Sequence, residues 1–228
     1  MTKYEQALDT IKYVRSQTDE VILFNSLGKD SLVTLDLIAP HFRRVVCVFM
    51  YFVPDLDHIN RFINQVSCRY NNIEILQIPH FCLTIAHKYG CYCIPNEKQK
   101  KMNLRDVVKI VREKLGIEYV FLGMKKADGM NRRLMLDTYK DNHYINKFMC
   151  YPVATWTNKE ILAYMKQHRL PEPIRYNPKK AGGGLGFNLD SHLWMEKNAP
   201  QDLEKFYQVY PWSRRILYEY HYNNPKEE

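Results

Sequence analysis

The stretch VILFNSLGKDSLVTLDLIA, residues 21–39, decides the fold class of this chain of 228 residues. It opens with the apolar run VILFNS, which is typical of a short buried strand. After the loop LGKDS, the run SLVTLDLIA places Leu32, Leu35 and Ile38 on one face of a helix. A buried strand that leads through a short loop into an amphipathic helix is the repeating unit of an α/β fold.

The same alternation of strand and helix continues along the chain. Apolar runs predict further strands at 43–52, 73–79, 118–123 and 148–153. The helical spacing of apolar residues predicts helices at 4–17, 56–70, 103–116 and 157–168. Strands that alternate with helices pair in parallel through right-handed crossovers. We therefore predict an α/β fold with a five-stranded parallel sheet, Rossmann-like, and helices on both of its faces.

The composition of the chain changes near residue 170. The segment LPEPIRYNPKKAGGGLGFN begins there, is rich in Pro and Gly, and is expected to be irregular. Residues 201–222 are expected to be helical in part, with an interruption at Pro211. We therefore expect one domain over residues 1–175 and an irregular and helical C-terminal extension, residues 176–228, packed on it.

The charge balance favours an anionic partner. Lys and Arg total 33 and Asp and Glu total 25, which gives a formal charge of +8. No stretch approaches the roughly 18 uncharged apolar residues of a membrane span, so we expect no membrane contact. The first 20 residues are charged throughout, unlike a secretory signal. We therefore expect a cytoplasmic protein whose six cysteines are thiols rather than disulfides.

The loop between the first strand and its helix has the composition of an anion cradle. Parallel sheets bind ligands beyond the carboxyl ends of their strands, where a helix start adds free N–H groups and positive potential. Lys29 adds a full charge, and the hydroxyls of Ser26 and Ser31 can donate hydrogen bonds. The loop is no Walker A motif, since Phe24 and Asp30 stand where that pattern needs Gly and Ser or Thr. A capped turn without a ligand is the alternative to a phosphate site.

Three segments together resemble a known family. SLGKDS (26–31) is similar to the pyrophosphate-binding loop S-G-G-x-D-S of the PP-loop ATP pyrophosphatase superfamily. Its S-x-G-x-D-S form is that of the phosphoadenosine phosphosulfate (PAPS) reductase branch. GMKKAD (123–128), followed by Arg132 and Arg133, resembles the G-x-R-R/K-x-D/E…R segment of that branch. YPVATWT (151–157) resembles the beginning of its P-x-x-D-W-T signature.

The resemblance implies a PP-loop nucleotide-binding domain over residues 1–175 and names its site. It places the adenine nucleotide against Ser26, Leu27, Gly28, Lys29, Asp30, Ser31, Gly123, Asp128 and Trp156. The candidate catalytic residues, which would neutralise phosphate charge, are Lys29, Lys125, Arg132 and Arg133. A solvated basic face is the alternative for the two arginines. The Gly-rich segment 182–186 is a candidate lid over the nucleotide, or a plain linker.

Three positions depart from the family patterns. Leu27 replaces one of the two glycines of the superfamily loop, which the reductase branch tolerates. Thr155 replaces the Asp before Trp156, so this chain lacks that carboxylate. Lys125 replaces an Arg, which keeps the charge and loses the bidentate geometry.

The resemblance leaves ATP and PAPS open as substrates. With ATP, the usual reaction is attack at the α-phosphorus with release of pyrophosphate, and a Mg²⁺ ion held mainly by phosphates and water is expected. A PAPS reductase needs a nucleophilic cysteine on a C-terminal tail, and no cysteine follows Cys150 here. We therefore expect a transferase that adenylates an acceptor, ahead of an oxidoreductase that reduces PAPS through an unusual thiol. A non-catalytic protein that binds nucleotide or nucleic acid is the third alternative.

Cysteines and basic residues form the remaining candidate sites. His80, Cys82, Cys91 and Cys93 have side chains that suit zinc or an iron–sulfur cluster, but the C-x-C spacing lacks a second pair, which favours ordinary thiols. Basic pairs recur along the chain, with 17 Tyr and 10 Phe interleaved. Such surfaces bind nucleic acid, although most are only solvated. Nucleic acid and a second copy of the chain are therefore kept as candidate partners.

Overall fold

A computed structural model describes residues 2–177 and 184–224. The chain forms two compact units, which we call the sheet unit and the helical unit. The sheet unit comprises Met1–Met50, Gln65–Ile78 and Val108–Pro173. The helical unit comprises Tyr51–Asn64, Pro79–Val107 and Ile174–Glu228. The domain boundary expected at residue 175, with the extension packed on the first domain, stays a prediction.

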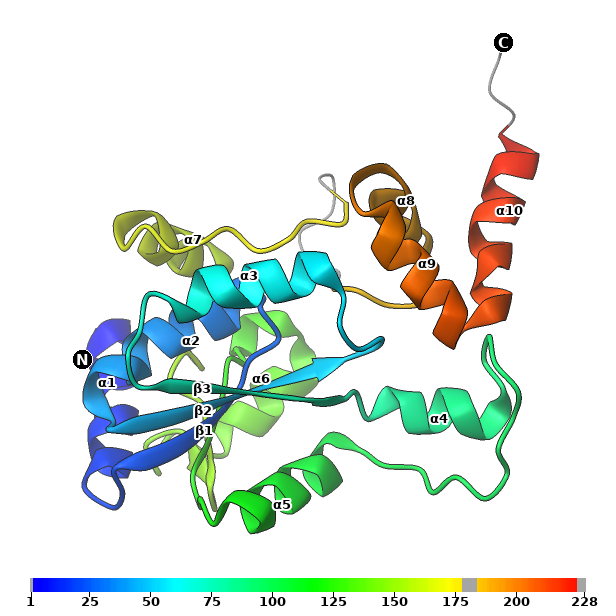
Figure 1. Cartoon of the computed structure of the whole chain (residues 1–228). Helices are drawn as coiled ribbons and strands as arrows, with labels where there is room; N and C mark the ends of the chain where they lie inside the picture. The colour runs from blue at the N-terminus through cyan, green and yellow to red at the C-terminus, as the bar shows by residue number, and fades with distance from the viewer. Residues whose placement is uncertain (1, 178–183, 225–228) are drawn as a thin grey trace. The chain divides into compact units, whose positions relative to one another are not determined.

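The sheet has six strands in the order β3-β2-β1-β4-β6-β5. Figure 1 labels β1, β2 and β3, which lie side by side. Their bounds are β1 Glu20–Phe24, β2 Arg44–Tyr51, β3 Ile73–Pro79, β4 Val120–Leu122, β5 Ile145–Asn146 and β6 Met149–Cys150. Strand β1 pairs in parallel with both β2 and β4, and β4 pairs in parallel with β6. The α/β fold and the adjacency of the first and fourth predicted strands are thereby confirmed.

The predicted count of five parallel strands is wrong. The segment predicted as a fifth strand is shorter than expected, and β5 pairs with it antiparallel as a sixth. Lys147 lies in the turn between the two strands with φ 55°, in the left-handed region that a tight turn can require. Nothing in the apolar pattern of a two-residue strand distinguishes it from a loop.

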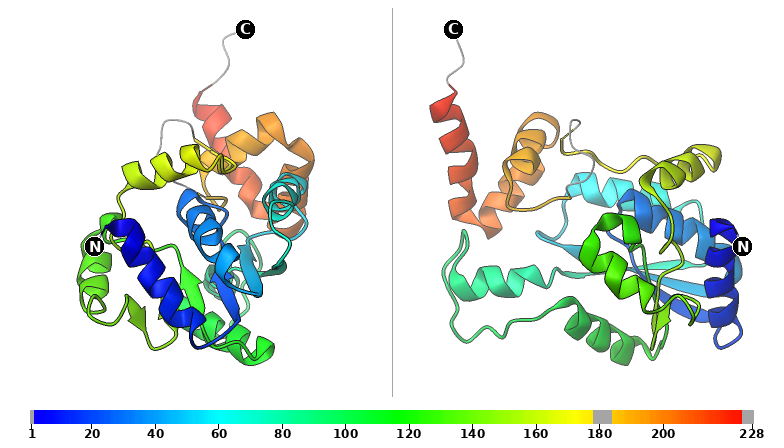
Figure 2. Two further views of the ribbon diagram at one scale, coloured as in Figure 1. Left: turned by 90° about the vertical axis from the view of Figure 1, so that its left-hand side faces the viewer. Right: turned by 180° about the vertical axis from the view of Figure 1, so that it is seen from behind.

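The helices of the predicted α/β pattern are all present. They are α1 Lys3–Arg15, α2 Lys29–Ile38, α3 Asp57–Ser67, α5 Leu104–Leu115 and α7 Asn158–Gln167. Helices α2 and α5 lie on opposite faces of the sheet (Figures 1 and 2). The middle strand β1 is apolar on both faces, and Val21, Ile22 and Leu23 have no exposed surface. The predicted capping box at α7 is confirmed, since Thr157 Oγ1 accepts from the N–H of Glu160.

Some helices could not be predicted from the spacing of apolar residues. Helices α4 Cys82–Tyr89, α6 Met130–Asp137 and α8 Leu189–Asn198 were not predicted. Helices α4 and α6 have eight residues each, and α8 buries Ser191, His192 and Met195, so none of the three shows a long apolar stripe. Short 3-10 turns also occur at Ala39–His41 (η1), Lys126–Asp128 (η2) and Pro211–Ser213 (η3).

The helical unit is built around aromatic side chains. Helix α8 packs against α9 Pro200–Val209 and α10 Arg214–Asn223, and the break expected at Pro211 is confirmed. The ring of Phe187 packs edge-on against Phe206 and Tyr210, at centroid distances of 5.6 and 4.7 Å. The candidate lid 182–186 lies partly outside the described residues. Within the described ranges, no helix is long and apolar enough to cross a membrane.

A buried polar network ties the start of α3 to α9 inside the helical unit. Asp202 is 1% exposed and accepts from the backbone N–H groups of Asp57 and His58 at 2.8 and 2.9 Å. Its carboxylate lies 2.6 Å from His58 Nδ1, and His58 Nε2 lies 2.8 Å from the hydroxyl of Tyr176. The free N–H groups at the start of α3 thus find a carboxylate acceptor, which also favours the dipole of that helix.

Buried histidines make the stability of the helical unit depend on pH. Burial lowers the pKa of His58 although Asp202 opposes it, and burial also lowers the pKa values of His80 and His192. Below pH ~6.5 the unfolded chain therefore binds more protons than the folded one. We predict that the free energy of unfolding in urea falls as the pH falls from about 7.5 to 5.5, by up to ~1.4 kcal/mol per pH unit for each such histidine.

Two variants test the source of this slope. His58→Gln should reduce the loss of stability between the two pH values, because one of the contributing rings is gone. His221→Gln, at the half-exposed ring that contacts Glu196, is the control and should leave most of the slope in place. Stability that rises on acidification would contradict the prediction.

Candidate functional site

The loop after β1 is shaped by two residues with defined backbone roles. Leu27 has φ 59°, in the left-handed region that favours glycine, and its N–H donates to Asn25 Oδ1 at 2.9 Å. Gly28 is the N-cap residue of α2, with extended φ and ψ of −84° and 164°, and no side chain caps this helix. The first N–H groups of α2 are left for a ligand or water, at the positive end of the helix dipole.

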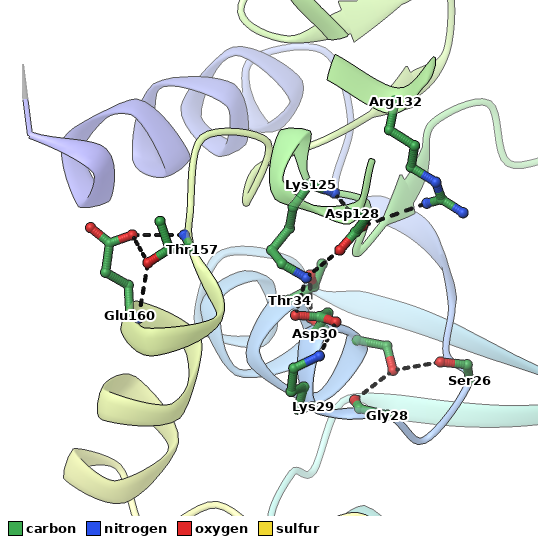
Figure 3. Close-up of polar contacts among 11 residues, drawn as sticks. Ser26, Gly28, Lys29, Asp30, Thr34, Lys125, Asp128, Arg132, Thr157 and Glu160 are labelled. Atoms are coloured by element: carbon green, nitrogen blue, oxygen red, sulfur yellow. Dashed lines mark hydrogen bonds and ion pairs between the residues drawn. The ribbon is translucent and has the colours of Figure 1, made fainter. Parts of the chain in front are cut away.

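Two hydroxyls stand at this helix start. Ser26 Oγ lies 3.3 Å from Ser31 Oγ, and Ser31 Oγ also donates to the carbonyl of Gly28 at 2.9 Å (Figure 3). Ser26 is exposed while Ser31 is buried. The loop therefore presents the accessible hydroxyl of Ser26 beside the free N–H groups, a set of donors that suits phosphate oxygens, while the hydroxyl of Ser31 is engaged with the backbone of Gly28.

Lys125 is the cation that joins this loop to the end of β4. Its side chain is fully buried, and Nζ lies 2.6 Å from Asp30 Oδ1 and 2.8 Å from Asp128 Oδ1 (Figure 3). The backbone N–H of Lys125 also donates to Asp128, at 2.9 Å. Burial opposes ionisation of Asp128, but the bonds from Lys125 outweigh it and hold the pKa of Asp128 below its usual value. The buried charge is thus matched by two carboxylates.

The remaining cations differ in their freedom. Lys29 Nζ pairs with the other oxygen of Asp30, Oδ2, at 2.9 Å, and its side chain is 27% exposed. Arg132 lies on α6, and its Nη1 atom is 3.8 Å from Asp128 Oδ2. Arg133, on the same helix, is exposed. The structure therefore brings Lys29, Lys125 and, more loosely, Arg132 to one acidic centre, while direct contact of any of them with a nucleotide stays a prediction.

Gly123 is needed for the close approach of β4 to α2. A Cβ atom at this position would lie 2.9 Å from both the carbonyl carbon and the carbonyl oxygen of Asp30, and 3.0 Å from the N–H nitrogen of Ser31. These are backbone atoms at the start of a helix, so they cannot move aside cheaply. The family-like glycine at 123 therefore has a steric role in placing Lys125 against the loop.

The third family-like segment fastens α7 to α1. The indole N–H of Trp156 donates to the carbonyl of Lys3 at 3.1 Å, and Thr155 Oγ1 donates to Gln6 Oε1 at 3.0 Å. The segment also accepts a bond at Ala154 from the backbone N–H of Lys126, at 2.8 Å. Trp156 is 5% exposed. The segment thus holds the neighbours of Lys125 in place, and nucleotide contact by Trp156 stays a prediction.

Sequence reasoning missed the part played by Asn25. Its side chain is 2% exposed, receives the N–H of Leu27, and hydrogen-bonds the thiol of Cys47. A polar residue at the end of an otherwise apolar strand was the available signal, since a buried amide needs partners.

The cysteines differ in exposure: Cys47 and Cys150 are buried, whereas Cys68 and Cys91 are exposed. Burial raises the pKa of Cys47 to about 12 and raises the pKa of Cys150 further, and it also raises the pKa values of Cys82 and Cys93. In the described parts of the chain, no group of three or more His, Cys, Asp or Glu side chains could hold a metal ion. This applies to the candidate ligands His80, Cys82, Cys91 and Cys93. The interpretation as ordinary thiols stays a prediction.

Comparison with protein families agrees with the three segments. A model of the phosphoadenosine phosphosulfate reductase domain matches residues 20–178. The chain belongs to this family. No curated protein matches the chain.

Solved structures resemble the chain in fold. The NH3-dependent NAD synthetase from Campylobacter jejuni, solved with a nitrate ion, has a TM-score of 0.50 at 14% identity, covering 100% of this chain and 99% of that one. The U34-tRNA thiolase from Methanococcus maripaludis has a TM-score of 0.42 at 16% identity, covering 93% of this chain and 78% of that one. At such identities the likeness to the synthetase supports the α/β fold of this PAPS reductase domain protein and no more.

The close approach at Gly123 predicts a steric defect. Gly123→Ala should destabilise the sheet unit by about 1–3 kcal/mol, the usual cost of overpacking, because the new methyl group meets helix backbone. Urea unfolding measures the change. Gly184→Ala is the matched control, since a Cβ there meets nothing within 4 Å, and it should be neutral. Equal effects of the two substitutions would show that β4 and α2 do not approach as described.

The burial of Lys125 predicts that it matters to folding more than Lys29 does. Lys125→Met removes the partner of two carboxylates and should cost about 3–5 kcal/mol of stability, as for a broken buried ion pair. Lys29→Ala removes a partly exposed pair and should cost less than about 1 kcal/mol. Thermal and urea unfolding of both variants make the comparison. A stable Lys125→Met protein would refute the description of this ion cluster.

Proposed function

We propose that this protein is an enzyme that binds ATP through the loop Ser26–Ser31 and transfers its adenylyl group to an acceptor, with release of pyrophosphate. The observation that carries the proposal is the start of α2, which has uncapped N–H groups, the hydroxyl of Ser26 close to Ser31, and Lys29 as its first residue. This arrangement supports binding of a chain of phosphates better than that of a neutral ligand. Membership in the PAPS reductase domain family supports an adenine nucleotide.

The ion cluster gives Lys29 the freedom that this role requires. Each oxygen of Asp30 has its own ammonium, Lys125 on Oδ1 and Lys29 on Oδ2. If Lys29 turns to a phosphate oxygen, Asp30 keeps the fixed charge of Lys125 and is not left bare. Lys125 would then act as a positioning residue that holds Asp30 and the start of α2, while Lys29 neutralises charge on the leaving pyrophosphate.

Magnesium would arrive with the nucleotide. Asp30 and Asp128 are the carboxylates at the site, and both are paired with cations. Among the residues that the structure describes, no group of three or more His, Cys, Asp or Glu side chains could hold a metal ion. No step of the proposal is assigned to the ion. Mg²⁺ bound mainly by phosphates and water agrees with this donor set.

Reduction of PAPS through a thiol of this chain is the less supported alternative. The attacking species must be a thiolate, and burial raises the pKa values of Cys47, Cys82, Cys93 and Cys150. Cys68 lies on the surface, and its thiol donates to the carbonyl of Gln65. A non-catalytic nucleotide-binding or nucleic-acid-binding protein would share the loop and would release no pyrophosphate.

Binding tests the loop. Lys29→Ala should weaken ATP binding by about 1–3 kcal/mol in calorimetry, as expected for a lost charge-assisted contact. Lys109→Ala removes the same charge from an exposed position on α5 and should not change the affinity. Equal ATP affinity in Lys29→Ala and in the folded parent would remove this loop from the site.

Turnover distinguishes the reactions. The protein is incubated separately with ATP and with PAPS plus thioredoxin, and pyrophosphate, AMP and sulfite are measured. We expect pyrophosphate from ATP and little sulfite from PAPS. Sulfite release without pyrophosphate would overturn the proposal, and Cys91→Ser and Cys93→Ser would then show whether either thiol attacks.

A further inference from the structure

The helical unit exposes aromatic side chains that its core does not use. Tyr89 at the end of α4 is 61% exposed, Trp212 in η3 is 54% exposed, and Tyr218 on α10 is 69% exposed. Tyr222 follows Tyr218 one turn later, and their rings stack at a centroid distance of 6.2 Å. Single exposed aromatics are ordinary, but several on neighbouring segments call for an explanation.

These aromatics lie on segments that contact one another within the helical unit. The loop after α4 reaches the start of α10 (Figures 1 and 2), where the backbone N–H of Trp212 donates to the carbonyl of Tyr92 at 3.3 Å. Lys101 returns to the end of α4, with Nζ 3.3 Å from the hydroxyl of Tyr89 and 5.7 Å from the centre of its ring. Tyr89 and Trp212 therefore flank one continuous loop.

The same loop carries unpaired positive charge. Lys98, Lys100 and Lys101 are all exposed, and in the described parts of the chain no carboxylate pairs with any of them. Lys88 Nζ holds the loop in place by donating to the carbonyls of Glu97 and Gln99, at 2.9 and 3.3 Å. The three lysines are thus held on a defined loop next to an exposed ring.

We propose that this surface, the tyrosine–lysine face, binds a single-stranded polynucleotide. We define it as Tyr89, Lys98, Lys100, Lys101, Trp212 and Tyr218. Exposed rings offer flat faces on which bases of any sequence can stack, and the lysines match the phosphates that link those bases. Lys101 Nζ lies over the ring of Tyr89, 5.7 Å from its centre, so a cation and an exposed ring occur together on this surface.

Charge favours this occupant over a second copy of the chain. A symmetric contact would bring the same three lysines of both copies together, which is repulsive. A duplex would hide its bases from the rings and use only the lysines. The proposal does not depend on the reaction at the loop Ser26–Ser31, because it uses only residues of the helical unit.

Salt dependence tests the lysines. A fluorescein-labelled oligothymidylate of about 16 nucleotides serves as the probe in anisotropy titrations at several salt concentrations. The triple variant Lys98→Ala/Lys100→Ala/Lys101→Ala should lose about tenfold or more in affinity at low salt. Its slope of log affinity against log salt should fall by about 2, since each phosphate contact on a single strand contributes about 0.7.

A charge-matched control makes that result specific. Lys109→Ala/Lys114→Ala/Lys140→Ala removes the same net charge from exposed positions of the sheet unit and should bind like the parent. Equal losses in the two triple variants would mean that only net charge attracts the probe, and would overturn the proposal. The absence of saturable binding by the parent protein would overturn it as well.

Stacking is tested at the tyrosines. Tyr89→Ala and Tyr218→Ala should each weaken binding by about fivefold or more, whereas Tyr4→Ala, at an exposed ring on α1, should not. Because both rings are exposed, thermal unfolding should be unchanged. A duplex of the same length that binds as tightly as the single strand would overturn the stacking role. Self-association of the parent that Tyr218→Ala abolishes would show instead that the face joins two copies.

Discussion

The ammonium of Lys125, buried between Asp30 and Asp128, is the interaction on which the sheet unit depends. It joins the end of β4 to the first turn of α2, two segments that are far apart in sequence. A buried charge is tolerated only when it is closely matched, so the positions of both carboxylates are tightly constrained. Gly123 permits the approach, and the bond from Lys126 to Ala154 extends the constraint to the segment before α7. The three family-like segments are therefore one mechanical assembly.

This constraint also bears on the ligand role that we propose for the loop. A helix start normally satisfies its free N–H groups with a side-chain cap, and both α1 and α7 have such caps in Thr2 and Thr157. The N-cap residue of α2 is instead Gly28, which has no side chain that could act as a cap. Lys125 holds Asp30 in the first turn without using those N–H groups, so the donors stay directed outward. The ion cluster thus holds the first turn in place, and the uncapped N–H groups stay available for the nucleotide that we propose.

The sequence was sufficient for what depends on local pattern. The strand and helix around Ser26–Ser31 and the glycine at 123 were identified from residue order, because apolar periodicity and motif spacing are local properties. The burial of Lys125 could not be predicted, since a lysine is ordinarily exposed and its partners come from two different segments. The β5–β6 hairpin and helix α6 were missed because such short elements are set by their packing. The tyrosine–lysine face could not be predicted either, because it depends on the contact between the loop after α4 and η3.

Leu27 shows how the loop keeps its shape with only one of the two glycines of the superfamily pattern. A left-handed conformation costs a residue with a side chain about 1–2 kcal/mol. Here the side chain is only 7% exposed, and burying a leucine contributes about 1.5–3 kcal/mol. The bond from its N–H to Asn25 adds to this. Packing and a local amide thus replace the conformational freedom of glycine, so the turn that presents Gly28 and Ser31 follows from the core beneath it.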